Sequence, residues 1–467
     1  MELVAQNKAK FDVLRGKYPD FSYLDYSWVR QGSTLVMSFT YALSLADIVT
    51  TTLSIRLPEE VTDEAVRAHE DYIFRIGLIE ALSYWKAYCS PKIRILCGSL
   101  SESEIAWWRD TWYDGMGEFR YRNGLLDVSK DSWVEFVAGS KISEKSVHDF
   151  SKLSGNLIAF TGGKDSTLAL GLLRDEGGNT NETFFVQALA PARDAIKEVL
   201  GVSSYPETIV ERHMHERLLA LNAEGALNGH TPFSIVVAFL GMLTASLRGK
   251  KYFIVANESS ADESTVAGTD INHQYSKSLI FEKRFQSFCK SLWPNGPQYF
   301  SLLRPFSEIG IVTLLKKYED TMLFVSSCNV KNKKGQWCGS CPKCLFAFML
   351  FSAEWNIAFA ERMFGTNMFT KGEYLGMLEE LTGLAPTKPF ECVGTTKESL
   401  AILSLILSKQ SEAKNMPLLI VFLERHADIL PSPEMYKMIA CEFHEHAIAD
   451  ESFVVRIKQA QDEVCHE

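Results

Sequence analysis

The feature that most constrains this chain is a short glycine loop between a buried strand and a helix. After the apolar run 157–160 and before the helical run 167–173, the chain reads Thr161-Gly162-Gly163-Lys164-Asp165-Ser166. A strand, a glycine turn and a helix start can hold a polyphosphate. Glycine lets backbone N–H groups approach the anion, and the helix start adds positive potential. The loop therefore predicts a polyphosphate site.

Individual residues of the loop suit a nucleotide bound with a metal ion. Thr161 and Ser166 supply hydroxyl donors, and Lys164 adds positive charge. Asp165 would repel phosphate unless it faces a bridging Mg²⁺, so it predicts magnesium-assisted nucleotide chemistry. The loop is not a Walker A motif, because no glycine lies five residues before Gly163 and Lys164 is followed by aspartate. An ordinary βα turn with a helix cap is the structural alternative.

Short apolar strands alternate with helices around this loop. The predicted strands are 157–160, 183–189, 208–212, 251–256 and 321–326. Five βα units predict an α/β fold with a parallel five-stranded sheet and helices on both faces, because right-handed crossovers permit little else. We expect an N-terminal α+β domain over 1–150, an ATP-binding domain over 151–350 and a C-terminal helical domain over 351–467.

Four of the ten cysteines fall within one short stretch: Cys328, Cys338, Cys341 and Cys344. Four soft thiolate ligands at this spacing suit tetrahedral zinc, and a closed four-ligand shell is structural. A pair of disulfides or an iron–sulfur cluster is the alternative. The other cysteines are scattered, and such cysteines are most often small core hydrophobes.

Composition and charge exclude several classes of protein. With 46% hydrophobic and 23% charged residues, the chain is neither disordered nor collagen-like. Its formal net charge of −10 argues against a general nucleic-acid binder, which needs a basic face. The longest apolar run, 234–247, is too short to span a bilayer, and no signal-peptide pattern is visible. We expect a cytoplasmic protein that binds neither nucleic acid nor membrane.

Polar residues follow the predicted strands at the edge where parallel sheets bind ligands. His230 lies in a Gly-His-Thr-Pro segment before a long helix, where a capping or structural histidine is an equal alternative. Asn257 and Glu258 follow the fourth predicted strand. The run 272–278 offers amide, imidazole, phenol and ammonium donors to an anionic ligand, with a solvated loop as the alternative.

The glycine loop resembles the Ser-Gly-Gly-x-Asp-Ser signature of the PP-loop ATP pyrophosphatases, with Thr161 in place of the first serine. The resemblance implies an adenine-nucleotide α-hydrolase-like fold, in which ATP is split between its α- and β-phosphates and the loop holds pyrophosphate. The cysteine cluster is similar to the zinc loop of nitrile-forming PP-loop synthases.

Several segments together resemble the ATP-dependent UDP-N-acetylmuramoyl-L-alanyl-L-glutamate epimerases of peptidoglycan synthesis. The most specific are Asn-His-Gln-Tyr-Ser-Lys-Ser at 272–278 and Phe-Glu-Cys-Val-Gly at 390–394. The other matching segments are the phosphate loop, the cysteine cluster, 83–87, 115–123, 229–232, 257–258 and the residues 388–389 that precede the second run. The resemblance implies that UDP-MurNAc-L-Ala-L-Glu is converted to its D-Glu epimer while ATP is converted to AMP and pyrophosphate.

From the residues and this resemblance, we expect ATP, Mg²⁺ and structural Zn²⁺ as ligands. The candidates for catalysis are His230, Cys392, His273 and Lys277. The candidates for binding the substrate are Asn257, Glu258, Asn272 and Tyr275. Either His230 or Cys392 could be the base, and the sequence leaves that choice and the oligomeric state open.

Two other functions fit the same residues. One is another PP-loop adenylating enzyme, which would form an amide or a nitrile or would transfer sulfur. The other is a non-enzymatic, zinc-bearing nucleotide sensor.

Overall fold

One ten-stranded mixed sheet organises the computed structural model, which describes residues 2–139, 148–174, 180–187, 192–331 and 335–465. The strand order is β10-β9-β6-β7-β8-β3-β2-β1-β4-β5. The strands are β1 (Asp20–Gln31), β2 (Thr34–Ser44), β3 (Asp47–Arg56), β4 (Lys92–Ile95), β5 (Glu135–Ala138), β6 (Asn156–Ala159), β7 (Asn181–Val186), β8 (Glu207–His213), β9 (Tyr252–Val255) and β10 (Gln298–Ser301).

The sheet is parallel in one half and mixed in the other. Strands β10, β9, β6, β7 and β8 pair in parallel. Strand β3 then pairs antiparallel with β8, placing Leu53 opposite Arg212, and the β1–β2–β3 meander continues the sheet. The predicted adenine-nucleotide α-hydrolase-like sheet of five parallel strands is therefore wrong, because β3 extends the sheet past β8 and brings the N-terminal strands into it.

One predicted strand is also misplaced. The predictions over 157–160, 208–212 and 251–256 correspond to β6, β8 and β9, and the prediction over 183–189 overlaps β7 but ends outside the described residues. The stretch 321–326 forms no strand, since most of it lies in the 3₁₀ segment η3 (Lys316–Phe324), where Leu323 is 71% exposed. The place beside β9 is taken by β10 instead.

The helices before residue 320 accompany the sheet. They are α1 (Glu2–Lys17), α2 (Asp63–Arg67), α3 (Glu70–Trp85), α4 (Glu102–Gly115), α5 (Gly117–Arg122), α6 (Lys130–Trp133), α7 (Lys164–Leu173), α8 (Ala192–Val199), α9 (Arg217–Ala223), α10 (Phe233–Leu247), α11 (Leu279–Leu292) and α12 (Glu308–Leu315). Two short 3₁₀ segments also matter for the site, η1 (Ser259–Asp262) and η2 (Tyr275–Lys277).

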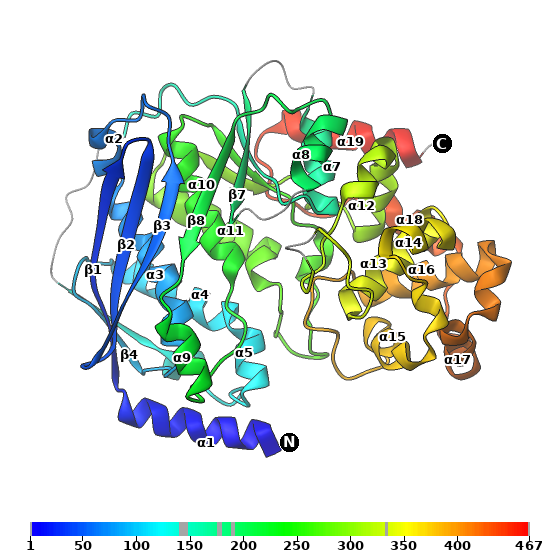
Figure 1. The fold of residues 1–467 in the computed structure, drawn as a ribbon, viewed down its shortest axis with the longest axis horizontal. Coiled ribbons are helices and arrows are strands. Elements are labelled where there is room, and N and C mark those ends of the chain that lie inside the picture. Colours follow the sequence, from blue (N-terminus) through cyan, green and yellow to red (C-terminus); the bar gives the residue numbers. More distant parts are fainter. Residues whose placement is uncertain (1, 140–147, 175–179, 188–191, 332–334, 466–467) are drawn as a thin grey trace.

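The described chain after residue 351 is helical, as predicted, and lies beside the sheet (Figure 1), and the first helix of this part begins earlier, at Pro342. Its helices are α13 (Pro342–Glu354), α14 (Ile357–Phe364), α15 (Leu375–Leu381), α16 (Thr396–Lys409), α17 (Pro417–His426), α18 (Glu434–Ala440) and α19 (Glu451–Cys465). The division into three domains at residues 150 and 350 stays a prediction.

Alternate residues of the central strands pack into two hydrophobic cores, one on each face of the sheet. Leu157 and Phe253 belong to the core that includes α3, α10 and α11. Ile158 and Ile254 belong to the core that includes α7, α12, α13 and the C-terminal helices. This alternation follows from the two-residue period of a strand. The sheet and the C-terminal helices therefore share one core, which fixes their relative position.

Among the helices that the structure describes, none is both long and apolar enough to cross a membrane.

Candidate active site

The phosphate loop connects β6 to α7, and its side chains hold one another in place. The Ser166 hydroxyl accepts the Thr161 N–H at 3.2 Å and donates to the Gly163 carbonyl at 3.1 Å. Gly163 is the N-cap of α7, which begins at Lys164. Because the first N–H groups of a helix have no partner within it, this end of α7 can attract an anion.

Both glycines of the loop are required by its geometry. Gly162 has a φ of +81°, in the region that favours glycine, and a Cβ there would lie 3.1 Å from Arg193 Cγ. A Cβ at Gly163 would lie 2.8 Å from Ser327 Oγ, which is closer than real Cβ contacts. The loop backbone is therefore packed from two sides and has little freedom to move.

Lys164 is buried, and its ammonium group pairs with the carboxylates of Asp165 and Glu308. Burial opposes its charge, but the two carboxylates outweigh burial and raise the pKa of Lys164. Burial also raises the pKa of Glu308. The phosphate contact of Lys164 stays a prediction, because in this structure its charge is already balanced by carboxylates.

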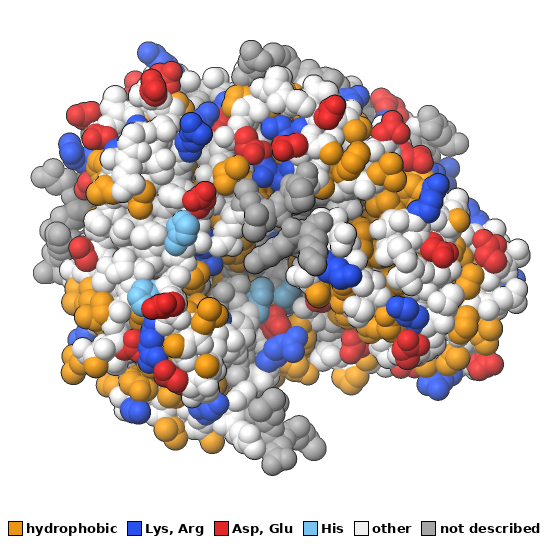
Figure 2. Space-filling view, in the orientation of Figure 1, with side chains coloured by type: hydrophobic (Ala, Val, Ile, Leu, Met, Phe, Trp, Pro, Cys, Tyr) orange, Lys and Arg blue, Asp and Glu red, His pale blue; other side chains and the backbone are white. Residues whose placement is uncertain are grey.

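A cavity of about 420 Å³ lies at the carboxyl ends of β6 and β9. Strand β6 lies between β7 and β9, at a switch point of the kind where α/β sheets bind ligands. Figure 2 shows this face hollowed between the sheet and the C-terminal helices, with histidine, acidic and basic side chains at the rim. The cavity wall combines the phosphate loop with six distant polar residues: Asn257, Glu258, Lys277, Glu308, Lys343 and Cys392.

Cys392 lies on the cavity wall between two cationic groups. Lys277 Nζ lies 3.3 Å from Cys392 Sγ, and the His273 side chain hydrogen-bonds the same thiol. Burial raises the pKa of Cys392, but Lys277 and His273 outweigh it and lower that pKa to about 6. The thiol is therefore ionised at neutral pH, which is the form that removes protons or attacks carbonyls.

His273 and His230 share one buried carboxylate, that of Glu118 on α5. Glu118 Oε2 lies 2.6 Å from His273 Nδ1 and 3.7 Å from His230 Nδ1. Burial lowers the pKa of His273, but Cys392 and Glu118 outweigh burial and raise it to about 9. Burial and the neighbouring His273 lower the pKa of His230 to about 4. The cluster therefore holds its proton on His273 and keeps His230 neutral.

Sequence reasoning missed Glu118. The residue lies in segment 115–123, which carries the family resemblance, yet no spacing pattern pointed to a carboxylate there. Its role depends on contact with His273, 155 residues away. The run Gly-Met-Gly-Glu-Phe-Arg-Tyr-Arg, where one acid lies between glycines and aromatic residues, was the available signal.

Contacts of the residues just before Cys392 fix its segment against the sheet domain. Lys388 pairs with Glu263, and the Phe390 ring packs 5.2 Å from the Tyr121 ring and 6.4 Å from the His273 ring. A single β-bridge between residues 266 and 387 adds a backbone connection. The C-terminal helical part therefore supplies Cys392 to a site whose other residues lie mainly on the sheet domain.

Two of the predicted substrate residues turn away from the cavity. The Asn272 side chain donates to the Ala261 carbonyl at 2.7 Å and accepts the Gln274 N–H at 2.6 Å, so it closes its own loop. The Tyr275 hydroxyl accepts from Arg284 Nη1 at 2.8 Å, beside α11. Neither belongs to the cavity wall, whereas the predicted residues Asn257 and Glu258 do.

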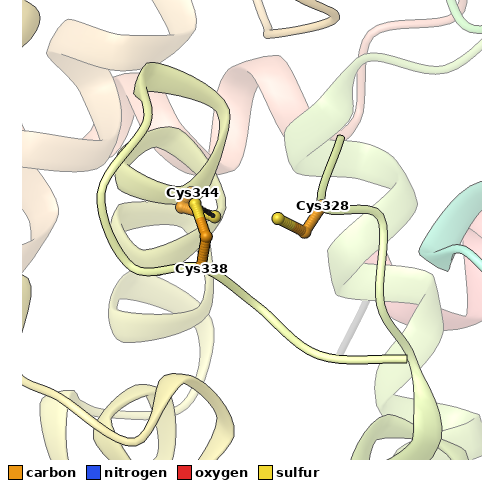
Figure 3. A group of neighbouring side chains, drawn as sticks. All are labelled: Cys328, Cys338 and Cys344. Atoms are coloured by element: carbon orange, nitrogen blue, oxygen red, sulfur yellow. Dashed lines mark hydrogen bonds between the residues drawn. The ribbon is translucent and has the colours of Figure 1, made fainter. Parts of the chain in front are cut away.

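The cysteine cluster brings thiols from two segments together beside the cavity. Figure 3 shows the sulfurs of Cys328, Cys338 and Cys344 facing one another, and all three lie within 4.8 Å. Cys341 also hydrogen-bonds Cys344 through its side chain and is the N-cap of α13. Three of the four predicted thiols thus converge as soft donors of the kind that bind zinc, and Cys341 is outside that group. Because α13 also carries cavity residue Lys343, a metal here would fix one wall of the site.

Cys441 and Cys465 form a disulfide that the sequence did not predict. They lie among the scattered cysteines, 24 residues apart, and join the end of α18 to the end of α19. The expectation that the scattered cysteines are isolated core residues is wrong for this pair, since the helix packing that brings them together is not visible in local sequence.

Family comparisons account for most of the chain. The MurL N-terminal domain matches residues 14–302, and the MurL C-terminal domain matches residues 324–434. The chain belongs to the MurL family. The two matched regions of the MurL family meet at the cavity, because the first contains the phosphate loop and Glu118 and the second contains Cys392.

Three curated MurL relatives carry the name UDP-N-acetyl-alpha-D-muramoyl-L-alanyl-L-glutamate epimerase, and each is 30% identical to the chain. The relative from Xanthomonas oryzae pv. oryzae aligns over 72% of this chain and 74% of its own length. The relatives from Salinispora tropica and a Micromonospora species align over 85% and 81% of this chain, and over 86% and 85% of their own lengths. The chain is therefore an isomerase of the epimerase type.

Proposed function

We propose that this epimerase inverts the terminal L-Glu of UDP-MurNAc-L-Ala-L-Glu to D-Glu in peptidoglycan precursor synthesis. We further propose that it uses ATP and releases AMP and pyrophosphate. Support for the substrate comes from the names of relatives that align over most of both chains. Support for ATP comes from the phosphate loop and its resemblance to the PP-loop signature. The cytoplasm stays the predicted location.

The chemistry gives ATP a clear role. A carboxylate hinders removal of the neighbouring C–H proton, because its negative charge opposes the carbanion that forms. Transfer of AMP to that carboxylate removes the charge and leaves an acyl group, so the α-proton becomes far more acidic. A base can then remove the proton, and return of a proton from the other face inverts the centre. Hydrolysis of the acyl-adenylate releases the product.

The observation that carries this proposal is the single cavity that unites an anion-binding loop with an ionised thiol. The phosphate loop would hold the β- and γ-phosphates of ATP at the start of α7. Asp165 and Glu258 line the same cavity, and their carboxylate oxygens are ligands that suit Mg²⁺. ATP and the acid that it activates would therefore meet within reach of Cys392.

Of the two candidate bases, we assign the role to Cys392. Its thiol lies on the cavity wall and is held as a thiolate by Lys277 and His273. His230 is not part of that wall, and its ring lies 4.5 Å from the His273 ring. The ammonium group of Lys277 lies on the cavity wall as well, where it can stabilise negative charge that develops on the substrate oxygen.

The decisive experiment is incubation of the purified protein with ATP, Mg²⁺ and the UDP-linked dipeptide, followed by acid hydrolysis and chiral analysis of glutamate. The proposal predicts D-Glu together with AMP and pyrophosphate, with or without added ammonia. L-Glu unchanged after ATP has been consumed would contradict it.

Two further outcomes identify the alternatives. Incorporation of nitrogen or sulfur into the product would indicate another adenylating reaction. ATP binding without pyrophosphate release, in both the unmodified protein and Asp165→Ala, would indicate a sensor. The proposal predicts release in the unmodified protein and its loss in Asp165→Ala.

A further inference from the structure

We propose that Glu118 is a positioning residue that holds His273 against Cys392 in its protonated form, so that Cys392 is a thiolate before any substrate binds. This inference rests on the proposed function only for what the thiolate does in the reaction. The state of the thiol itself can be measured in the protein alone.

The geometry forms a continuous relay from the carboxylate to the thiol. Glu118 Oε2 lies 2.6 Å from His273 Nδ1, and the His273 side chain hydrogen-bonds Cys392. The other carboxylate oxygen, Oε1, pairs with Arg122 Nε. Each oxygen of Glu118 thus has its own partner, and this fixes the carboxylate plane relative to the imidazole. The Glu118 side chain is only 8% exposed, so solvent screens this pairing weakly.

The alignment of His273 has two further supports. Its backbone N–H donates to Thr265 Oγ1 at 2.9 Å, and its ring meets the Phe390 ring edge-on at 6.4 Å. The first contact fixes the start of the 272–278 run, and the second connects the imidazole to the segment of Cys392. The imidazole therefore reaches both its carboxylate and its thiol without a change in the backbone.

The charges around Cys392 come from several elements. Lys277 on η2 lies 3.3 Å from the thiol, and Lys343 on α13 adds a more distant positive charge. On the far side of Lys277, Glu258 and Asp165 supply negative charge. Lys277 thus has carboxylates as well as the thiol to balance it. Lys277 lowers the pKa of the thiol most, and the hydrogen bond and charge of His273 add to that effect.

Glu118 also faces charged and titratable groups other than its two hydrogen-bond partners. Besides His273 and Arg122, it faces His230, whose Nδ1 lies 3.7 Å from Glu118 Oε2. Lys86, the C-cap of α3, places its ammonium group near His230 and donates to the Gly229 carbonyl at 2.9 Å. Burial and His273 keep His230 neutral, so the cationic partner of Glu118 in the relay is His273.

The test measures the ionisation of Cys392 directly. The purified protein, without ATP or substrate, is alkylated with iodoacetamide over a range of pH, and the rate at Cys392 is followed by peptide mass spectrometry. In the unmodified protein we expect the rate to rise with a midpoint near the thiol pKa of about 6. Glu118→Gln keeps the size of the side chain but removes the charge that favours imidazolium. His273 then loses its proton at lower pH, and the Cys392 midpoint moves up.

The expected shift in Glu118→Gln is at least about one pH unit, equal to about fivefold slower alkylation at pH 6, where half of the thiol is ionised in the unmodified protein. Glu118→Asp keeps the charge but shortens its reach, so an intermediate midpoint is expected. Glu104→Gln is the matched control, because Glu104 is a similarly buried carboxylate that pairs with Arg75 outside the cavity. It should keep the midpoint of the unmodified protein.

If the alkylation midpoint is unchanged in every Glu118 variant that folds, the inference is wrong. A merely structural Glu118 would lower activity at every pH and leave the midpoint where it is. Should the proposed function fail while the alkylation midpoint still moves, the relay stands and only its use in epimerisation is lost. Where epimerisation is observed, the acid limb of kcat/KM should move up together with the alkylation midpoint.

Discussion

Replacing Gly162 by alanine tests whether the phosphate loop binds the nucleotide. The residue has a φ of +81°, and an added Cβ would lie 3.1 Å from Arg193 Cγ. A non-glycine residue in this region costs on the order of 1–2 kcal/mol, and the close contact adds to that strain. The loop can relieve the strain only by turning its N–H groups away from the phosphate position. A loss of about 1.4 kcal/mol in transition-state binding corresponds to a tenfold loss of rate, so we expect kcat/KM for ATP to fall at least about tenfold.

Gly201→Ala provides a matched control for this experiment. Gly201 has a φ of +72°, and nothing lies within 4 Å of the position of its Cβ. Both variants should therefore lose thermal stability through the backbone strain that they share, but only Gly162→Ala should lose ATP-dependent pyrophosphate release, measured by a coupled phosphate assay. Equal pyrophosphate release in the two variants would refute the assignment of this loop to the nucleotide.

Three further predictions concern metal, pH and redox state. The purified protein should contain about one zinc per chain, and Cys338→Ser should lose it while Cys89→Ser keeps it, as measured by elemental mass spectrometry. Burial lowers the pKa of His69 to about 4. Between pH 6.5 and pH 4 its imidazole is therefore protonated in the unfolded chain and neutral in the folded chain. His69 should therefore account for a loss of about 2 kcal/mol of stability between pH 7 and pH 5, and His69→Gln should reduce the total loss over that range by about this amount in urea titrations. Reduction of the Cys441–Cys465 disulfide, which spans 24 residues, should lower the free energy of unfolding by about 3 kcal/mol, and an unchanged melting temperature under reductant would contradict this.

The local parts of the fold could be predicted because their signals are local. The strand, glycine turn and helix start around 157–173 follow from apolar runs and turn chemistry, and the structure has β6, the loop and α7 there. The misplaced strand shows the limit of such signals. The apolar run 321–326 looks like a buried strand, but Leu323 and Phe324 are exposed in η3. The short segment 298–301, which forms β10, is less apolar.

Long-range pairing could not be predicted. The register of β3 on β8 joins residues about 160 positions apart, and nothing in either strand specifies the other as its partner. The same limit applies to the site. The sequence supplied Cys392, Lys277 and His273 as separate candidates, but the contact with Cys392 emerges only when the C-terminal helical part docks on the sheet. The carboxylate of Glu118 joins them only through the packing of α5 against the 272–278 run.

Turnover in heavy water tests the central claim most directly. The account predicts that deuterium enters the α-carbon of the terminal glutamate only when both ATP and the protein are present, and that the D-Glu product carries it. Mass spectrometry of the recovered glutamate after chiral separation measures both quantities. D-Glu that retains the original hydrogen, or deuterium exchange that proceeds equally without ATP, would contradict activation of the carboxyl group as the step that frees the α-proton.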